Sequence, residues 1–335
     1  MNNDHPKARL VFVSSCFNEE GNVRELHRRC REVHQRIQPE IPGGEGLDFA
    51  MVIADNCSND DTLAVLLQIA EEDHAVLILA NASNYGPEVS TANALSHTQE
   101  GDVVVVITSD LQDPPELVLT MVQTLLLEPG CDAVLATKKS SSGSPMLRLC
   151  RNFYYLALGY TSRLRIVPRG YHGFGVYRHA VIEEALNFWQ GSGMNLRMCL
   201  VNSCHAPRML GYSQQARYSG RSSYQGWDYP REALKALLAS DSTASRLAFG
   251  LSAMGVISAG TIAFILLVNW MQGNSRYEPG TPTVMALVLG SFAMQMLIVA
   301  VLSKQVEELR FAKFRPKVRT SPVGKAQPKR LPSQE

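Results

Sequence analysis

Apolar runs alternate with segments of helical spacing over the first half of the chain. Runs with the length and the β-branched content of buried strands lie at residues 9–16, 49–54, 76–79, 102–108 and 132–137. Between them, apolar positions recur every three or four residues, which predicts helices at 18–35, 63–72 and 115–127. This alternation predicts an α/β domain with a doubly wound, mostly parallel sheet, which we expect to occupy residues 1–228.

A polar loop follows three of the predicted strands, at Phe17–Glu19, Asp55–Asp60 and Asp110–Asp113. Because the carboxyl ends of parallel strands meet at one edge of a sheet, we expect these loops to form one ligand site. The dinucleotide fingerprint GxGxxG does not follow the first run, and the sequence has no phosphate loop of the GxxxxGKS or GxxxxGKT type. A nucleotide, if bound, therefore requires a different kind of site.

The composition changes abruptly near residue 245. Residues 247–270 and 283–303 contain no charged side chain, and each run is long enough to span a bilayer. Glycines in these runs favour two closely packed transmembrane helices, with a buried helical hairpin as the alternative. We expect the chain to continue after the main domain as an interfacial amphipathic helix and linker at 229–245, the two helices at 246–303 and a basic tail at 304–335.

Charges beside the apolar runs predict their orientation. The connection between the runs contains Arg276 and Glu278, whereas the tail after Ser303 carries nine lysines and arginines. The positive-inside tendency predicts a cytoplasmic tail, and a hairpin puts the main domain on the same side. The amino terminus also lacks the basic start and apolar segment of a signal peptide. We therefore expect a multi-pass protein of the inner membrane with its main domain in the cytoplasm.

Bulk properties of the chain argue against other classes of protein. The net charge of +1 gives no overall attraction to nucleic acid, so we expect no nucleic-acid partner. The seven cysteines are scattered without a CxxC pair, which argues against a disulfide framework or a zinc site.

The polar loops contain motifs that resemble those of the family 2 glycosyltransferases with a GT-A fold. The stretch 15–20 (SCFNEE) resembles the family's Pro-x-Tyr-Asn-Glu-Glu, and 55–62 (DNCSNDDT) resembles Asp-Asp-Gly-Ser-x-Asp-Gly-Thr. The stretch 83–86 (SNYG) stands where the family has Arg-Asn-Phe-Gly. Within the family, 110–116 (DLQDPPE) and 217–224 (RYSGRSSY) resemble the branch that transfers sugars to polyprenyl phosphates.

This resemblance implies an inverting transferase that moves a sugar from a UDP- or GDP-type nucleotide-sugar donor to polyprenyl (undecaprenyl) phosphate. It also implies a homo-oligomer at the membrane. Catalytic roles fall to Asp110 and Arg217, and the acceptor phosphate is expected at Arg217 and Ser222. The residues expected at the nucleotide sugar are Ser15, Phe17, Glu19, Asp55, Asn84, Ser109 and Asp110.

Residue chemistry supports part of this expectation independently. Departure of a nucleoside diphosphate concentrates negative charge, and without a basic phosphate loop a Mg²⁺ or Mn²⁺ ion held by oxygen ligands is the natural counter-charge. Asp110, at the end of the most strand-like run, and Gln112 are the expected metal ligands. Arg148 and Arg151 lie between the sheet and the apolar runs, where a lipid phosphate needs arginine, and we expect them to bind the acceptor phosphate.

Departures from the family pattern leave alternatives open. Thr108 replaces the first aspartate of the usual Asp-x-Asp, and Asn56, Ser83 and Ser223 also replace charged residues. The acceptor is then either polyprenyl phosphate or, alternatively, a glycan or lipid-linked oligosaccharide of surface-polysaccharide assembly. A catalytically weak membrane scaffold is a further alternative. His172 is either a base or a core or loop histidine.

Overall fold

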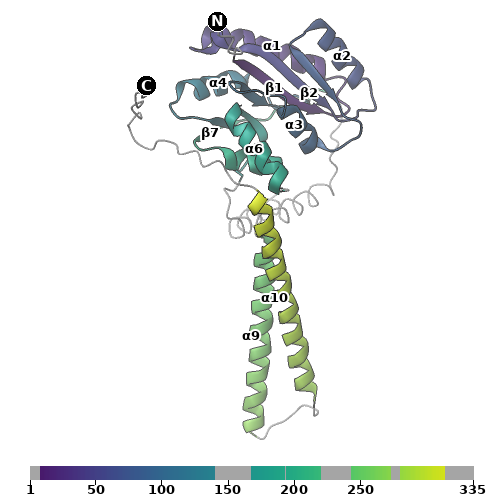
Figure 1. The fold of residues 1–335 in the computed structure, drawn as a ribbon, viewed down its shortest axis with the longest axis vertical. Helices are drawn as coiled ribbons and strands as arrows, with labels where there is room; N and C mark the ends of the chain where they lie inside the picture. The colour runs from purple at the N-terminus through teal and green to yellow at the C-terminus, as the bar shows by residue number, and fades with distance from the viewer. Residues whose placement is uncertain (1–7, 140–166, 193, 220–242, 273–279, 314–335) are drawn as a thin grey trace, which may run out of the picture.

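A seven-stranded mixed sheet forms the centre of the head of the molecule (Figure 1). The computed structural model describes residues 8–139, 167–192, 194–219, 243–272 and 280–313. The strands lie in the order β3-β2-β1-β4-β6-β5-β7, and β6 is antiparallel to both of its neighbours while the other pairs are parallel. They are β1 (Arg9–Cys16), β2 (Asp48–Asp55), β3 (Val76–Ala80), β4 (Val103–Val106), β5 (Ala133–Lys138), β6 (Tyr171–Arg178) and β7 (Pro207–Tyr212).

Helices cover both faces of this sheet, which explains the continuous apolar run Leu10–Val13 in β1. Leu10 and Phe12 pack on one face, and Val11 and Val13 pack on the other. The first face is covered by α1 (Val23–Glu40), α2 (Thr62–Glu72) and α4 (Leu117–Leu127), with the short helix η1 (Gly44–Gly46) after α1. The second face is covered by α3 (Pro87–Leu95), α6 (His179–Ser192) and α7 (Leu196–Ser203). The doubly wound, mostly parallel α/β sheet predicted from the sequence is confirmed.

The ends of some elements differ from the sequence prediction. The run at 102–108 forms strand only at Val103–Val106, because Asp102 closes the turn before it by accepting hydrogen bonds from Arg9 Nε at 3.0 Å and Gln99 N at 2.7 Å. The helix predicted from residue 18 begins at Val23, because Asn18 and the residues after it form a loop. Asn18 is hydrogen-bonded to Ser58 and Asn59 of the loop after β2.

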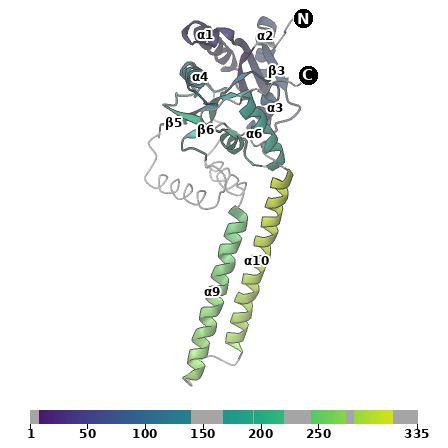
Figure 2. The ribbon, with the colours of Figure 1, turned by 60° about the vertical axis from the view of Figure 1, so that its left-hand side comes forward.

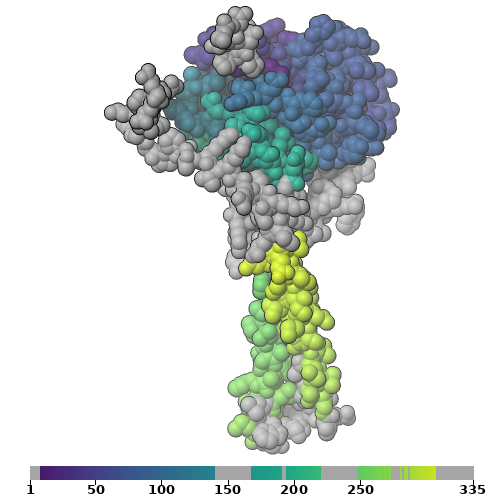
Figure 3. All heavy atoms as spheres, in the orientation of Figure 1, coloured from purple at the N-terminus to yellow at the C-terminus, as the bar shows by residue number. Residues whose placement is uncertain are grey.

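Two long apolar helices form a hairpin below the head (Figures 1 and 3). They are α9 (Thr243–Met271) and α10 (Thr281–Lys313), and their segments Ala248–Leu266 and Thr283–Val306 are long and apolar enough to cross a membrane. The predicted runs fall within these helices. Residues 304–313 of the predicted tail continue α10, which reaches α6 of the head (Figure 2). The predicted interfacial segment at 229–242 and the tail beyond 313 lie outside the described residues.

The two helices approach each other closely at Gly255 and Ala293. A Cβ atom added to Gly255 would lie 3.0 Å from Ala293 Cβ, and the Ser252 hydroxyl donates a hydrogen bond to the Ala293 carbonyl oxygen at 3.0 Å. Such close backbone contact through small residues is typical of packed membrane helices. Gly250 and Gly260, by contrast, have no heavy atom within 4 Å of an added Cβ, so these glycines do not serve the contact between α9 and α10.

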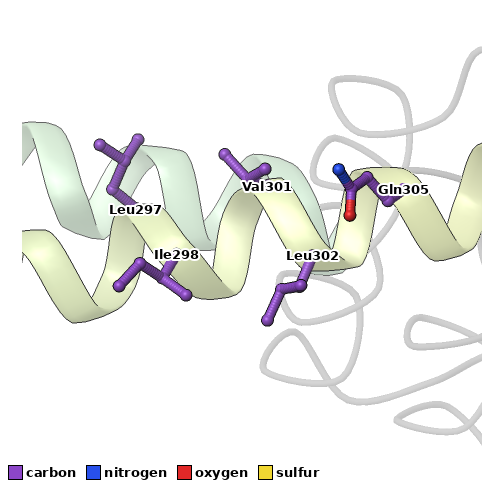
Figure 4. Close-up of a pocket in the computed structure, with 5 residues that line it drawn as sticks. All are labelled: Leu297, Ile298, Val301, Leu302 and Gln305. Carbon is purple, nitrogen blue, oxygen red and sulfur yellow. The ribbon is translucent and has the colours of Figure 1, made fainter.

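A shallow apolar hollow lies on the surface of α10 (Figure 4). It is lined by Leu297, Ile298, Val301, Leu302 and Gln305, so this stretch of the helix presents an amide beside aliphatic side chains. The hollow has the same apolar character as the other exposed faces of the hairpin.

The Gly255 contact predicts how the hairpin responds to added volume. A Gly255→Leu change should lower the melting temperature of the detergent-solubilised protein by several degrees, since overpacking a tight contact costs about 1–3 kcal/mol. Gly250→Leu is the matched control because it adds the same side chain to the same helix in open space, and it should leave the melting temperature unchanged or higher. Equal melting temperatures for both variants would contradict this helix contact.

Candidate functional site

The carboxyl ends of β1, β2 and β4 lie side by side. Cys16 pairs with Asp55 in the register of β1 and β2, and the Ser109 hydroxyl donates to the Ser15 carbonyl oxygen at 3.1 Å. The strand order reverses between β1 and β4, since β2 and β3 lie on one side of β1 and β4 lies on the other. Doubly wound sheets bind ligands at such a switch point. The predicted convergence of the three polar loops is therefore observed.

Each of these loops contains a residue other than glycine with a positive φ. They are Asn18 (56°), Cys57 (62°) and Leu111 (58°), and no other non-glycine residue of the described ranges has this conformation. A bulky leucine is poorly suited to it, and such strain costs about 1–3 kcal/mol. Burial of the Leu111 side chain in the core stabilises the turn, which leaves Asp110 and Gln112 partly exposed on either side.

Side chains tie the first loop to the second. Asn18 N donates to Ser58 Oγ at 3.0 Å, and Asn59 N donates to Asn18 Oδ1 at 2.9 Å. Asp55 is 2% exposed and accepts hydrogen bonds from both the backbone N and the hydroxyl of Ser58. Asp55 therefore organises the second loop at the floor of the site.

Asp60 lies farther along this loop, at the start of α2. Thr62 N donates to Asp60 Oδ1 at 3.1 Å, so this carboxylate satisfies a backbone N–H at the beginning of the helix. Asp60 therefore supports the start of α2 from the residue before its N-cap, Asp61.

Uncharged amides organise the part of the site beside β3. Asn56 Nδ2 donates to Asn84 Oδ1 at 2.7 Å, while Asn56 Oδ1 accepts from Tyr85 N at 2.9 Å. The side chain at position 56 thus both donates and accepts, which an ionised aspartate does not do. This explains the asparagine at a position where the resembling family has aspartate, and it brings the exposed Asn84 next to the β2 loop.

Thr108 links two carboxylates in the loop after β4. Its hydroxyl oxygen lies 2.9 Å from Asp110 Oδ1 and 2.9 Å from Asp113 Oδ2. Asp110 Oδ1 also accepts from Gln112 N at 3.2 Å, whereas Asp110 Oδ2 accepts no hydrogen bond from the described residues. The threonine hydroxyl therefore orients Asp110 without adding a third negative charge.

A buried cluster holds Asp113, which has no exposed side-chain surface. His172 Nε2 lies 3.0 Å from Asp113 Oδ1, and the Tyr212 hydroxyl donates to the same oxygen. Burial alone would raise the pKa of Asp113. Hydrogen bonds from His172, Tyr212 and Thr108, together with the charge of His172, outweigh burial and lower this pKa below its usual value. The cluster fixes the β4 loop to β6 and β7.

The β4 loop presents a small set of hard oxygen ligands. Asp110 contributes a carboxylate, Thr108 a hydroxyl, and Gln112 an amide oxygen that accepts from Gln214 Nε2 at 3.2 Å. No group of three or more His, Cys, Asp or Glu side chains suited to hold a metal ion occurs within the described ranges. A single carboxylate nevertheless suits Mg²⁺ or Mn²⁺ when phosphate oxygens and water complete the coordination. These residues fit a divalent cation whose remaining ligands are the oxygens of a bound phosphate compound.

The segment after β7 crosses this edge of the sheet, and we call residues 213–219 the strap. Gln215 N donates to the Gln112 carbonyl oxygen at 3.0 Å. At the other end, Asn22 Nδ2 donates to the Ser219 carbonyl oxygen at 3.2 Å. The strap therefore runs from the β4 loop to the start of α1, over the space between them.

Arg217 of the strap forms an ion pair with Glu19 of the β1 loop. Both side chains are largely buried, with exposed fractions of 18% for Arg217 and 7% for Glu19. Burial raises the pKa of Glu19, and the nearby charge of Asp110 raises it further, against the lowering by Asn22 and Arg217. Glu19, Asp110 and Arg217 thus belong to one charged site.

Lys138, which the sequence prediction missed, lies at the end of β5 on the far flank of this site. Burial lowers the pKa of Lys138, while the charges of Asp113 and Asp110 act in the opposite direction. A signal was present in the sequence, because the lysine directly follows a predicted strand and so emerges at the same edge as the acidic loops. Tyr212 emerges at that edge too, at the end of β7.

Most of the predicted site residues come together at this edge. The structure gathers Ser15, Phe17, Glu19, Asp55, Ser109, Asp110, Gln112 and Arg217 there, with Asn84 beside them. The predicted acceptor residues Arg148, Arg151 and Ser222 lie outside the described residues.

Comparison with known proteins gives matches over the same part of the chain. Residues 12–186 match the model of Glycosyl transferase family 2. An uncharacterized glycosyltransferase of Synechocystis sp. is 27% identical over 160 residues, which are 48% of this chain and 47% of the relative. The uncharacterized glycosyltransferase YkcC of Bacillus subtilis is 26% identical over 152 residues, 45% of this chain and 44% of the relative. The matched part is thus somewhat less than half the length of these curated relatives.

A solved structure similar to this chain is mannosyl-3-phosphoglycerate synthase from Rubrobacter xylanophilus, with a TM-score of 0.46 and 17% identity over 72% of this chain and 74% of that one. The family match lies in the sheet domain. It covers 175 of the 335 residues and includes the loops after β1, β2 and β4. The chain therefore belongs to glycosyl transferase family 2.

Proposed function

We propose that this chain is an inverting glycosyltransferase that moves a sugar from a UDP- or GDP-type donor to polyprenyl phosphate at the cytoplasmic face of the inner membrane. The observation that carries the proposal is that one chain contains both a charged site and an apolar helical hairpin. A charged site lies at the switch point of a family 2 domain, and this domain is joined to a hairpin long and apolar enough to span a bilayer. A lipid acceptor would explain both.

The donor half of the proposal rests on Asp55, Asp110 and Arg217. Asp55 lies at the end of β2, where the family resemblance implies a contact with the base or ribose, and its hydrogen bonds to Ser58 hold the second loop there. Arg217 lies at the charged edge, and a guanidinium suits the oxygens of a diphosphate. A bound Mg²⁺ or Mn²⁺ ion would supply further positive charge for the diphosphate leaving group. Asp110 and Gln112 would hold this ion, with Thr108 orienting Asp110.

The proposed acceptor, an ionised phosphate, is consistent with the contact between His172 and Asp113. In the proposed reaction, an anionic oxygen of the lipid phosphate forms a bond to the anomeric carbon. The bond from this carbon to the diphosphate breaks, and its electron pair leaves with the nucleoside diphosphate. An ionised phosphate needs no strong base to become a nucleophile. His172 is accordingly not required as a base, and its Nε2 is already engaged with Asp113.

The proposal predicts a lipid product. The purified protein in lipid nanodiscs, with Mn²⁺ or Mg²⁺, undecaprenyl phosphate and a panel of UDP- and GDP-sugars, should yield a sugar-phospholipid that mass spectrometry detects. Asp110→Asn should reduce its formation by at least about 100-fold, because electrostatic groups at a leaving group contribute on the order of 3–4 kcal/mol. Arg24→Gln, which changes an exposed ion pair with Glu72 away from the site, should retain wild-type activity.

Two results would contradict this assignment. Labelling of a glycan or lipid-linked oligosaccharide with no sugar-phospholipid would shift the acceptor to surface-polysaccharide assembly. Absence of turnover with every donor and acceptor, with Asp110→Asn still complementing a deletion strain, would indicate a scaffold.

The hydroxyl of Thr108 should matter for cation binding. Thr108→Val keeps the shape of the side chain but removes the hydroxyl, whose single proton can be donated to Asp110 or to Asp113. We expect Mn²⁺ affinity in the presence of UDP to fall about 10-fold or more, since hydrogen bonds to charged groups contribute about 1.5–3 kcal/mol. Thr108→Ser keeps the hydroxyl and should stay near wild type. Titration of free Mn²⁺ by electron paramagnetic resonance measures these affinities, and equal values for Val and Ser would refute the role of Thr108.

A further inference from the structure

Glu19 is fixed in the structure through both its backbone and its carboxylate. Its backbone N donates to Thr62 Oγ1 at 2.8 Å, which ties it to the start of α2. Its Oε2 accepts from Asn22 Nδ2, and its Oε1 accepts from Arg217 Nη2. Both carboxylate oxygens of Glu19 therefore already carry a hydrogen bond from the protein.

The charge and the contacts of Glu19 argue against direct binding of the nucleotide-sugar donor by this residue. The diphosphate of a nucleotide sugar is anionic, so the charge of Glu19 repels it. Arg217 is the cationic group suited to both anions, because a guanidinium carries five N–H donors and Arg217 already donates to Glu19. A negative side chain beside Asp110 is therefore explained most simply by its effect on Arg217.

The strap passes close to the β1 loop two residues after Glu19, at Gly21. A Cβ atom added to Gly21 would lie 2.8 Å from Ser219 Oγ, so the β1 loop has glycine where the strap passes. Asn22 contacts both partners, since its Nδ2 donates to Glu19 and to the Ser219 carbonyl oxygen. The far end of the strap is held by Gln112. Glu19 and Asn22 thus anchor the strap on the β1 side of the site.

We propose that Glu19 is a positioning residue that holds Arg217 and the strap across the donor site, rather than a residue that binds the nucleotide sugar. This inference rests on the proposed function for the identity of the donor. An arginine without the Glu19 carboxylate would sample more rotamers, and ordering such a side chain has an entropic cost. The ion pair meets this cost before the diphosphate arrives, so the donor finds Arg217 already in place.

The first test compares Glu19→Gln, Arg217→Gln and the double variant. Calorimetry with UDP and Mn²⁺ measures affinity, and transfer kinetics measure KM and kcat. We expect Glu19→Gln to weaken UDP binding and to raise the donor KM about 5- to 20-fold, with kcat changed less than about twofold, as expected for lost preorganisation. The double variant should bind UDP no more weakly than Arg217→Gln alone, because Glu19 acts through Arg217.

Glu20→Gln is the matched control. It removes the same charge one residue farther along, and its amide oxygen can still accept the hydrogen bond that Glu20 Oε2 receives from Asp61 N. This variant should bind UDP like the wild type. Losses of UDP affinity that multiply in the Glu19–Arg217 double variant would overturn the inference and indicate a separate contact of Glu19 with the donor.

The second test does not depend on turnover. Hydrogen–deuterium exchange of the strap amides in the protein without nucleotide should accelerate about 5-fold or more in Glu19→Gln and stay unchanged in Glu20→Gln. Only Glu19→Gln removes the charge that pairs with Arg217, and its single amide oxygen cannot accept from both Asn22 and Arg217 as the two carboxylate oxygens do. Unchanged exchange in a folded Glu19→Gln protein would overturn the inference. A wild type that transfers no sugar, with accelerated strap exchange in Glu19→Gln, would remove the proposed function and leave the Glu19 anchor established.

Discussion

Burial of β1 on both faces determines where the site of this protein can form. Alternate side chains of β1 enter the two cores, so the strand runs through the centre of the sheet between β2 and β4. After the carboxyl end of β1, the chain leaves the two cores and reaches the edge of the sheet as a polar loop. The same holds for β2 and β4, and the reversal of strand order between β1 and β4 opens space at their ends. The position of the polar loops follows from the packing of apolar residues.

The site gathers negative groups and assigns each a different partner. Asp113 is buried against His172 and Tyr212, Glu19 is paired with Arg217, and Asp110 is oriented by the Thr108 hydroxyl. Asp113 and Glu19 thus have both carboxylate oxygens engaged by hydrogen bonds from the protein, whereas Asp110 Oδ2 accepts none from the described residues. This difference makes Asp110 the carboxylate best suited to an incoming cation. Thr108 replaces the aspartate of the family motif, and its neutral hydroxyl can orient Asp110 without repelling it.

Much of the fold was predictable because strands β1 to β5 and several helices carry their own local patterns. Apolar runs indicated these five strands, and the polar stretches after three of them indicated the loops of the site. β7 was not predicted, because this edge strand is largely exposed and has no continuous apolar run. The partners within the site were not predictable in this way. Glu19 and Arg217 are 198 residues apart, and Asp113 and Tyr212 are 99 apart, so neither pair leaves a local pattern. Similarly, composition marked four glycines in the apolar runs, but only the packing of α9 on α10 distinguishes Gly255 from Gly250. His172 had two interpretations until its contact with Asp113 was known.

The central claim is that the edge formed by β1, β2 and β4 binds a nucleoside diphosphate together with a divalent cation at Asp110. Calorimetric titration of the full chain with UDP and with GDP, each with Mn²⁺ and with EDTA, tests it most directly. The account predicts that one of these nucleotides binds in the presence of Mn²⁺, that EDTA abolishes binding, and that Asp110→Asn abolishes the Mn²⁺ dependence. Binding by Asp110→Asn with wild-type affinity and wild-type Mn²⁺ dependence would contradict it.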